Sequence, residues 1–272
     1  MSFTVGNFFN NDNINIADQK GNFKVIEYVK DLSVMPHTAI TSYFASVTKC
    51  RKKQLVVELD QTIDGVVMQA GAMQWVAGNV NATSGIKGAK DLISKLFKSK
   101  VTGETAVKPE YKGQGMVVSE PTYKHLILMD LADWGGSVVL DDGLFLACDS
   151  SIKQTIAARK NLSSAVAGGE GLFNLALNGN GVFCIESPCP KGELIEINLD
   201  NDCVKIDGNL AIAWSNSLQF TTEASSRSIA GSIASGEGLV NVYRGTGKIL
   251  VAPLALNTML ARVGMLPPVA SR

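Results

Sequence analysis

The sequence has little of what catalytic and metal sites are made from. It contains two histidines, His37 and His125, which lie far apart in the chain and in unrelated contexts. A multi-histidine metal site of the kind found in cupin-like β-proteins therefore cannot be assembled, and each histidine is expected to be structural or on the surface. A Gly-x-Ser-x-Gly motif is also missing. We expect no catalytic residue, no metal and no cofactor, and we predict that the protein is not an enzyme.

Neither sign of charge is in excess. The chain has 25 Lys plus Arg against 25 Asp plus Glu, and its pI is about 6.7. Proteins that bind duplex nucleic acid generally carry a basic excess, because the neutralisation of phosphates supplies much of their affinity. The balance excludes dedicated DNA binding and argues against RNA as a partner.

Long apolar runs and paired cysteines are missing as well. The apolar runs fall far short of the 18 residues that suggest a membrane span. The odd number of cysteines, the absence of Cys-x-x-Cys pairs and of an apolar leader, and the chain's size predict reduced thiols in a cytoplasmic compartment. With no histidine nearby in sequence, Cys184 and Cys189 are expected to be structural thiols rather than nucleophiles. The five cysteines are Cys50, Cys148, Cys184, Cys189 and Cys203.

What the sequence does have is a repeat. Residues 169–185 return at 236–251 and, in a degenerate form, at 103–118. Each copy begins with Gly-Glu and contains a Gly-x-Gly pair, and successive pairs are 66 residues apart. Such regular spacing indicates an internal structural repeat. The pairs are Gly113 and Gly115, Gly179 and Gly181, and Gly245 and Gly247.

The stretches between these copies also repeat. Residues 138–147 match residues 204–213, and residues 66–75 are a looser relative. Runs of Val, Ile, Leu and Phe punctuated by Asp-Gly or Gly-Asn are typical of hairpins, so each unit is expected to contain a hairpin, a connection and a second hairpin. Gly-x-Gly inside a strand marks a bulge or a close approach of two backbones. Pro121, Pro188 and Pro253 are expected to end strands.

The composition suits a strand-and-turn protein with a full core, since 46% of the residues are hydrophobic and 26 glycines stand against 8 prolines. We predict an all-β fold, an antiparallel β-sandwich or barrel-like domain with a pseudo-threefold internal repeat. One repeat alone would bury too little apolar surface to be stable. The predicted divisions are an N-terminal arm (1–22), a single domain (23–254) with short strands across 23–47 and units at about 54–121, 122–188 and 189–253, and a C-terminal tail (255–272).

Three segments favour helix. Residues 85–100 carry apolar residues at helical spacing with lysines between them. This short basic helix is expected to cover an open sheet face; the alternative is a docking helix for a membrane surface or a partner. A helical turn is expected at 156–160 and a short C-terminal helix at 258–263. The lysines of the docking face are Lys87, Lys90, Lys95 and Lys98.

Three glutamates, Glu104, Glu170 and Glu237, recur at equivalent positions of the repeat. They are expected to accept backbone N–H groups and close a loop in each unit. The alternative is a cation site on a pseudo-threefold axis, which mutual repulsion of three carboxylates disfavours.

The sequence resembles the altered inheritance of mitochondria protein 24 family over about residues 23–254. The likeness rests on the threefold Gly-Glu and Gly-x-Gly pattern, on residues 71–80, and on residues 102–104 ahead of 111–115. In the first copy, Thr105 and Ala106 depart from the later copies, which puts the symmetry of that corner in doubt. The resemblance implies a fold similar to the tryptophan RNA-binding attenuator protein, oligomers, no established enzymatic activity, and, for mitochondrial members, a link with inner-membrane organisation.

Two functions follow as expectations. A repeat β-domain has strand edges that must be paired or covered, and symmetric self-association is the common solution. We therefore expect a non-enzymatic homo-oligomeric scaffold, a trimer or a higher multiple, with a possible peripheral contact with a membrane or a membrane protein. The alternative is a small-ligand-binding or regulatory module, and an enzyme is a distant third.

Overall fold

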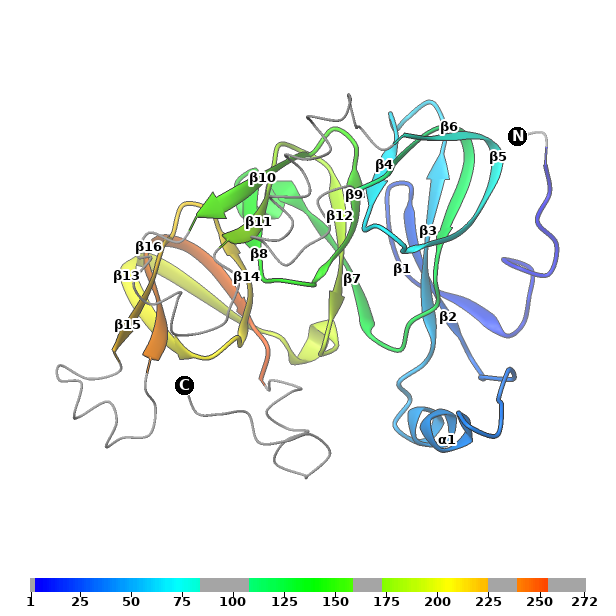
Figure 1. Cartoon of the computed structure of the whole chain (residues 1–272), viewed down its shortest axis with the longest axis horizontal. Helices are drawn as coiled ribbons and strands as arrows, with labels where there is room; N and C mark the ends of the chain where they lie inside the picture. The colour runs from blue at the N-terminus through cyan, green and yellow to red at the C-terminus, as the bar shows by residue number, and fades with distance from the viewer. Residues whose placement is uncertain (1–2, 84–107, 159–172, 225–238, 254–272) are drawn as a thin grey trace, which may run out of the picture.

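The computed structural model describes residues 3–83, 108–158, 173–224 and 239–253. Within these ranges the chain forms sixteen β-strands, one α-helix and two short 3₁₀ helices. All strand pairs between named strands are antiparallel. The predicted all-β class is confirmed (Figure 1).

Nine strands form the first sheet: β1 (Ile14–Lys20), β2 (Phe23–Tyr28), β3 (Lys53–Leu59), β4 (Val66–Met68), β5 (Met73–Thr83), β6 (Glu110–Ser119), β7 (His125–Asp130), β9 (Phe145–Asp149) and β12 (Val182–Ser187). Their order is β1-β2-β3-β6-β4-β9-β12-β7, and β5 pairs with β6. Because β7 returns to contact β1, β2 and β3, the sheet is a nearly closed barrel.

Seven strands form the second sheet: β8 (Ser137–Leu140), β10 (Lys153–Ala158), β11 (Phe173–Asn178), β13 (Ile195–Asp207), β14 (Ala211–Ser215), β15 (Gln219–Ala224) and β16 (Leu239–Val251). Their order is β10-β11-β8-β14-β16-β13, and β15 pairs with β16. The 3₁₀ helices are η1 (Leu131–Trp134) and η2 (Lys191–Glu193).

The strands form where continuous apolar runs can be buried on both faces. In β3, Leu55, Val56 and Val57 are fully buried, and the central core joins Leu140 of the second sheet to Phe183 of the first. Full burial of each such side chain stabilises the fold by about 1.5–3 kcal/mol. The three prolines end strands as expected, since β6, β12 and β16 stop one or two residues before them.

Strand register reproduces the sequence repeat. Three cross-strand residue pairs, one in each unit, lie at equivalent positions of the repeat. A second set of three cross-strand pairs lies further along each unit. Each unit is thus built on one central strand: β6, the interrupted strand β11–β12, or β16. The first set is Val66↔Tyr111, Val138↔Leu177 and Val204↔Tyr243, and the second is Trp75↔Val118, Ala147↔Cys184 and Ala213↔Leu250.

Gly113 and Gly115 lie in β6, Gly245 and Gly247 lie in β16, and Gly179 and Gly181 lie between β11 and β12. Gly113, Gly179 and Gly245 have φ of 131°, 122° and 121°, a region that side chains rarely adopt. At Gly115 an added Cβ would lie 2.0 Å from the backbone oxygen of Ala77. The first pair therefore marks the predicted close approach of two backbones, whereas the third pair lies opposite a register shift between Leu199 and Asp202.

The predicted hairpins within 138–147 and 204–213 are wrong in their pairing. β8 and β9 belong to different sheets, and β13 and β14 both pair with β16 rather than with each other. The second strand of each segment joins a different ladder, where it buries both faces. The helical turn predicted at 156–160 is also wrong, because residues 153–158 form β10 on β11.

The N-terminal residues depart from the predictions. Residues 1–22, expected as an arm, contain β1, which pairs with β2 from Ile14↔Tyr28 to Lys20↔Phe23. Residues 23–47, expected as short strands, contain only β2 and then helix α1 (Ala39–Val47). The β-branched and aromatic residues of α1 resemble a strand in composition. The extent of the domain, 23–254, stays a prediction.

Several predicted features lie outside the described residues. They are the helix at 85–100 with Lys87, Lys90, Lys95 and Lys98, the glutamates Glu104, Glu170 and Glu237, and the helix at 258–263.

Candidate assembly edges and an aromatic pocket

Successive units are joined by one kind of strand junction. In the first junction, β4 pairs with β9 through Val66↔Asp149, Val67↔Cys148 and Met68↔Ala147. This ladder joins an edge strand of the first unit to an edge strand of the second unit.

The second junction repeats the first. Here β8 pairs with β14, and the register is Val138↔Ser215, Val139↔Trp214 and Leu140↔Ala213. Each position lies one repeat further along than its counterpart in the first junction. The chain therefore uses the same pair of edges twice to place one unit beside the next.

Each of the two terminal units presents one of the two strand edges that form this junction. The third unit presents residues 204–206 of β13, the counterparts of β4 and β8, and within the described residues β13 pairs only with β16. The first unit presents residues 75–77 of β5, the counterparts of β9 and β14, and β5 pairs only with β6 there. Figure 1 shows β13 and β5 at opposite ends of the long axis.

The side chains at these two edges are partly solvent-exposed. Lys205 is exposed and Val76 is 40% exposed, whereas Ile206 is buried beneath its own unit. The N-terminal segment meets β5 through side chains, since the ring of Phe8 packs edge-on against Trp75 with centroids 5.4 Å apart. No ladder between this segment and β5 occurs in the described ranges, so β5 has only β6 as a strand partner there.

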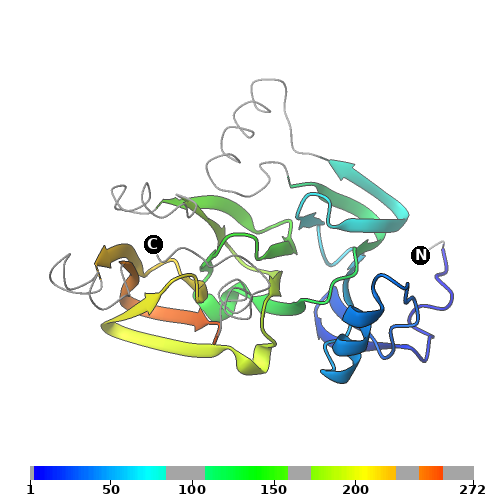
Figure 2. The same cartoon turned by 60° about the horizontal axis from the view of Figure 1, so that its bottom comes forward.

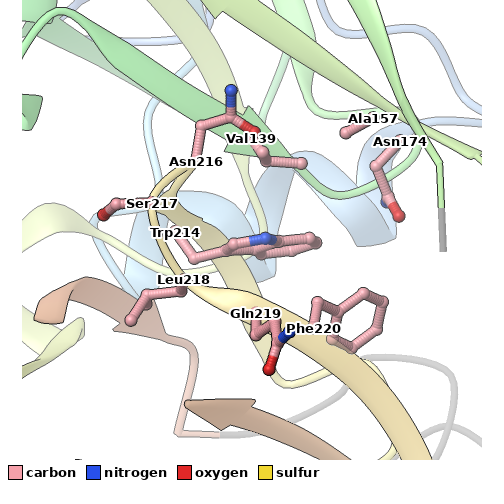
Figure 3. Close-up of a pocket in the computed structure, with 9 residues that line it drawn as sticks. All are labelled: Val139, Ala157, Asn174, Trp214, Asn216, Ser217, Leu218, Gln219 and Phe220. Carbon is pink, nitrogen blue, oxygen red and sulfur yellow. The ribbon is translucent and has the colours of Figure 1, made fainter. Parts of the chain in front are cut away.

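A pocket of about 230 Å³ opens in the second sheet between β14, β15 and β11 (Figure 3). Its floor is aromatic: the rings of Trp214 and Phe220 lie 5.3 Å apart, and Phe220 stacks on Tyr243 at 4.9 Å. Amide and hydroxyl groups complete the wall. The lining residues are Val139, Ala157, Asn174, Trp214, Asn216, Ser217, Leu218, Gln219 and Phe220.

One polar atom of this pocket is buried without a partner. Asn174 is 2% exposed, and its amide nitrogen donates to Asp141 Oδ1 at 3.3 Å. Its Oδ1 accepts no hydrogen bond from the described residues. Figure 3 shows the end of this side chain in the space between Ala157 and Phe220. A buried acceptor left unpaired costs about 1–3 kcal/mol, so the pocket is suited to a ligand that brings an N–H or O–H donor.

The sequence profile described as Mitochondrial biogenesis AIM24 matches residues 45–254, more than half of the chain. The chain belongs to this family. An uncharacterised protein of Streptococcus pyogenes serotype M6 is 28% identical over 225 residues, which cover 79% of this chain and 88% of that protein. A crystal structure of the protein SPYM3_0169 from Streptococcus pyogenes superposes with a TM-score of 0.58 at 23% identity, covering 93% of this chain and 99% of that one. This likeness shows the shared fold.

The histidines of this AIM24-family chain are separated, as the sequence indicates. His37 is exposed in the connection before α1. His125 begins β7 and lines a cavity of about 360 Å³ with Lys53 at the seam of the barrel. Burial, and then the charge of Lys53, lower the pKa of His125. The described residues hold no group of three or more His, Cys, Asp or Glu side chains placed for a metal.

The five cysteines lie in the described ranges and form no disulfide bond. Cys148, Cys184 and Cys189 are buried, and burial raises the pKa of Cys148 and Cys184. Protonated, inaccessible thiols are poor nucleophiles. Cys203 alone is exposed.

Helix α1 carries an apolar surface that was not predicted from the sequence. Ile40, Tyr43, Phe44 and Val47 are between 60% and 74% exposed. Their i, i+3, i+4, i+7 spacing is the signal that could have revealed a helix. No helix in the described part of the chain is long and apolar enough to cross a membrane.

Proposed function

We propose that this AIM24-family protein is a non-enzymatic scaffold that assembles by joining copies end to end. The observation that supports this is a matched pair of edges, β13 at one end and β5 at the other, each with a single strand partner among the described residues; they carry the two halves of a junction that the chain forms twice internally. A free edge of this kind is a template for another strand.

The internal junctions fix the register of the proposed contact. Residue 205 takes the place of Val67 and Val139, and residue 76 takes the place of Cys148 and Trp214. Lys205 of one copy would then lie opposite Val76 of the next. Ile206 would face Trp75, and Val204 would face Ala77.

Two different edges meet in this contact, so the interface is head-to-tail. Such interfaces close into rings when the rotation permits and otherwise extend into filaments. A two-membered closure is disfavoured because the two edges lie at opposite ends of the molecule (Figure 1). A trimer or a higher multiple is the expected assembly.

A charge exchange across the contact tests the proposal. Val76→Lys would place two lysines opposite each other, and like charges across a ladder are destabilising. The dissociation constant between copies, measured by sedimentation velocity on a dilution series, should rise by about fivefold or more. Adding Lys205→Glu to Val76→Lys should restore association.

The control is Ile156→Lys on β10. Ile156 is 42% exposed, close to the 40% of Val76, but among the described residues no unit uses the β10 edge or its counterparts to join another unit. This variant should assemble normally. Equal behaviour of Val76→Lys and Ile156→Lys, or no rescue by Lys205→Glu, would refute the proposed contact.

A second candidate function is the binding of a small ligand at the Trp214 pocket, favoured by the unpaired Oδ1 of Asn174. The ligand would have a planar apolar body for the aromatic floor and one hydrogen-bond donor for Asn174. A screen of such compounds by tryptophan fluorescence tests this function. Binding that survives Asn174→Leu would contradict it.

A peripheral membrane role and a cytoplasmic location remain part of the proposal. The lysines at 87, 90, 95 and 98 are the positively charged group that the sequence offers for the first. Quadruple substitution of these lysines by glutamine should abolish any binding to anionic vesicles that depends on them.

A further inference from the structure

Helix α1 is amphipathic, but its apolar side faces away from the protein. Ile40, Tyr43, Phe44 and Val47 form one stripe, which in a surface helix normally faces the core. Here that stripe faces away from the strands, with exposures of 74%, 64%, 60% and 61%. Figure 1 shows α1 below the first sheet, within the connection between β2 and β3, and Figure 2 shows the same helix with the bottom of that view turned forward.

The connection before the helix enlarges the same apolar surface. Leu32, Val34 and Met35 are also exposed. Of the twelve large hydrophobic side chains that are exposed in the described ranges, seven fall within residues 32–47. A concentrated exposed apolar surface of this kind indicates an interaction site. We call it the α1 tip: Leu32, Val34, Met35, Ile40, Tyr43, Phe44 and Val47.

Polar contacts fix which side of the helix faces outward. Ser42 is the buried residue of α1, and its side chain lies close to the Tyr123 hydroxyl. That hydroxyl donates in turn to the carboxylate of Asp31, which Lys52 Nζ also contacts at 3.1 Å. The Tyr123 hydrogen bond is the main cause that lowers the pKa of Asp31. The helix is thus held by its polar side and presents its apolar side.

The α1 tip itself carries no Asp, Glu, Lys or Arg, and the carboxylates near it are paired with cations. Residues 32–48 contain no Asp, Glu, Lys or Arg. The nearby acids are paired: Asp31 contacts Lys52, and Glu27 contacts Arg51 at 3.8 Å.

Two exposed lysines flank the α1 tip in the chain: Lys30 precedes it and Lys49 follows it. No carboxylate of the described residues pairs with either lysine. An apolar tip without Asp, Glu, Lys or Arg, flanked by two lysines, complements an anionic bilayer. The tip enters the interface, and the lysines remain at the level of the headgroups.

We propose that the α1 tip inserts into the interfacial layer of an anionic lipid membrane and anchors the protein there peripherally. The site is separate from the β5 and β13 edges, so it does not depend on assembly. Several tips on one oligomer would bind more tightly through multivalency.

Vesicle flotation tests the proposal with the full chain. The probes are vesicles of phosphatidylcholine alone and of phosphatidylcholine with phosphatidylglycerol. The unmodified protein should float with the anionic vesicles. Ile40→Ser with Phe44→Ser should lower its partition coefficient about tenfold or more, because two large apolar side chains no longer enter the interface. Lys30→Gln with Lys49→Gln should weaken binding several-fold to the anionic vesicles only.

Ile195→Ser is the matched control, since Ile195 is 50% exposed but lies on β13, in the second sheet. It should float as the unmodified protein does. The thermal midpoints of all variants should agree within a few degrees because the substituted side chains are exposed. If the double serine variant unfolds, the single variant Tyr43→Ser can be compared with the unmodified protein in the same flotation experiment.

Three results would overturn the proposal. The unmodified protein could fail to float with anionic vesicles, or the serine variant could float equally well. The serine variant could also lose mass in light scattering without vesicles, which would make the tip a contact between copies. Flotation of Val76→Lys separates the two ideas: lipid binding should persist in that variant whether or not assembly is lost.

Discussion

Val139 of β8 lies directly opposite Trp214 of β14, in the register that Val67 and Cys148 adopt one unit earlier. The recurrence shows that the repeat includes the way one unit is placed beside the next. A row of units with one recurring junction has two unmatched ends. These ends underlie the proposed assembly.

Gly115→Ala should destabilise the fold strongly. The added Cβ would lie 2.0 Å from the backbone oxygen of Ala77, which cannot rotate away. We expect a loss of about 2–4 kcal/mol in the free energy of unfolding, measured by chemical denaturation. Gly192→Ala is the control, because an added Cβ there has no atom within 4 Å. It should change stability by less than about 0.5 kcal/mol, and equal effects at both sites would contradict the close approach.

Glu223 should make stability depend on pH in the acid range. Arg244 contacts both of its carboxylate oxygens, at 2.5 and 2.9 Å, and with Thr221 lowers the pKa of Glu223 from 4.5 to about 2. A lowered folded-state pKa gives stability that is present above pH 4.5 and is lost as the pH falls toward 2. The pair is partly exposed, so the contribution should be below about 1 kcal/mol.

Glu223→Gln should remove this pH dependence and leave the rest of the acid profile unchanged. Thermal melts of both proteins across that pH range measure the difference. A constant difference in melting temperature at every pH would show that the ion pair does not contribute.

Thiol labelling of the native protein should be selective. Cys203 is exposed and should react first with a disulfide reagent, and half-buried Cys50 should react more slowly. Cys148, Cys184 and Cys189 should react only after unfolding, because they are buried and burial raises the pKa of the first two. Rapid native labelling of Cys184 would contradict the closed core.

Asn174→Leu should leave stability unchanged or raise it by up to about 1 kcal/mol. The substitution removes a buried oxygen without a partner, although it also removes the donor to Asp141. Thermal unfolding without added ligand measures this. A large loss would show that Asn174 is a structural residue rather than part of a binding site.

Much of the fold could be predicted from the sequence because the repeat is local and regular. The glycine pairs, such as Gly179 and Gly181, need backbone geometry that few residues tolerate, so their spacing survives in each unit. The pairing between units could not be predicted. Whether β8 pairs with β9 or with β14 depends on burial across long sequence distances, and hairpin signals describe only neighbours.

The candidate sites were less accessible from sequence. Val76 and Lys205 have no distinctive chemistry, and only the register shows that they are counterparts. The apolar spacing from Ile40 to Val47 predicts a helix but would place that face in the core. The buried Ser42 lies close to Tyr123, whose hydroxyl donates to Asp31, so the opposite side of the helix faces the protein, and these residues are far apart in the chain.

The molar mass of the unmodified protein in solution, measured by light scattering over a dilution series, tests the assembly most directly. We expect a discrete multiple of 28.9 kDa, threefold or higher, that dissociates only at low concentration. A mass of 28.9 kDa at all concentrations would mean that the β5 and β13 edges do not join copies. A closed dimer would also contradict a head-to-tail contact.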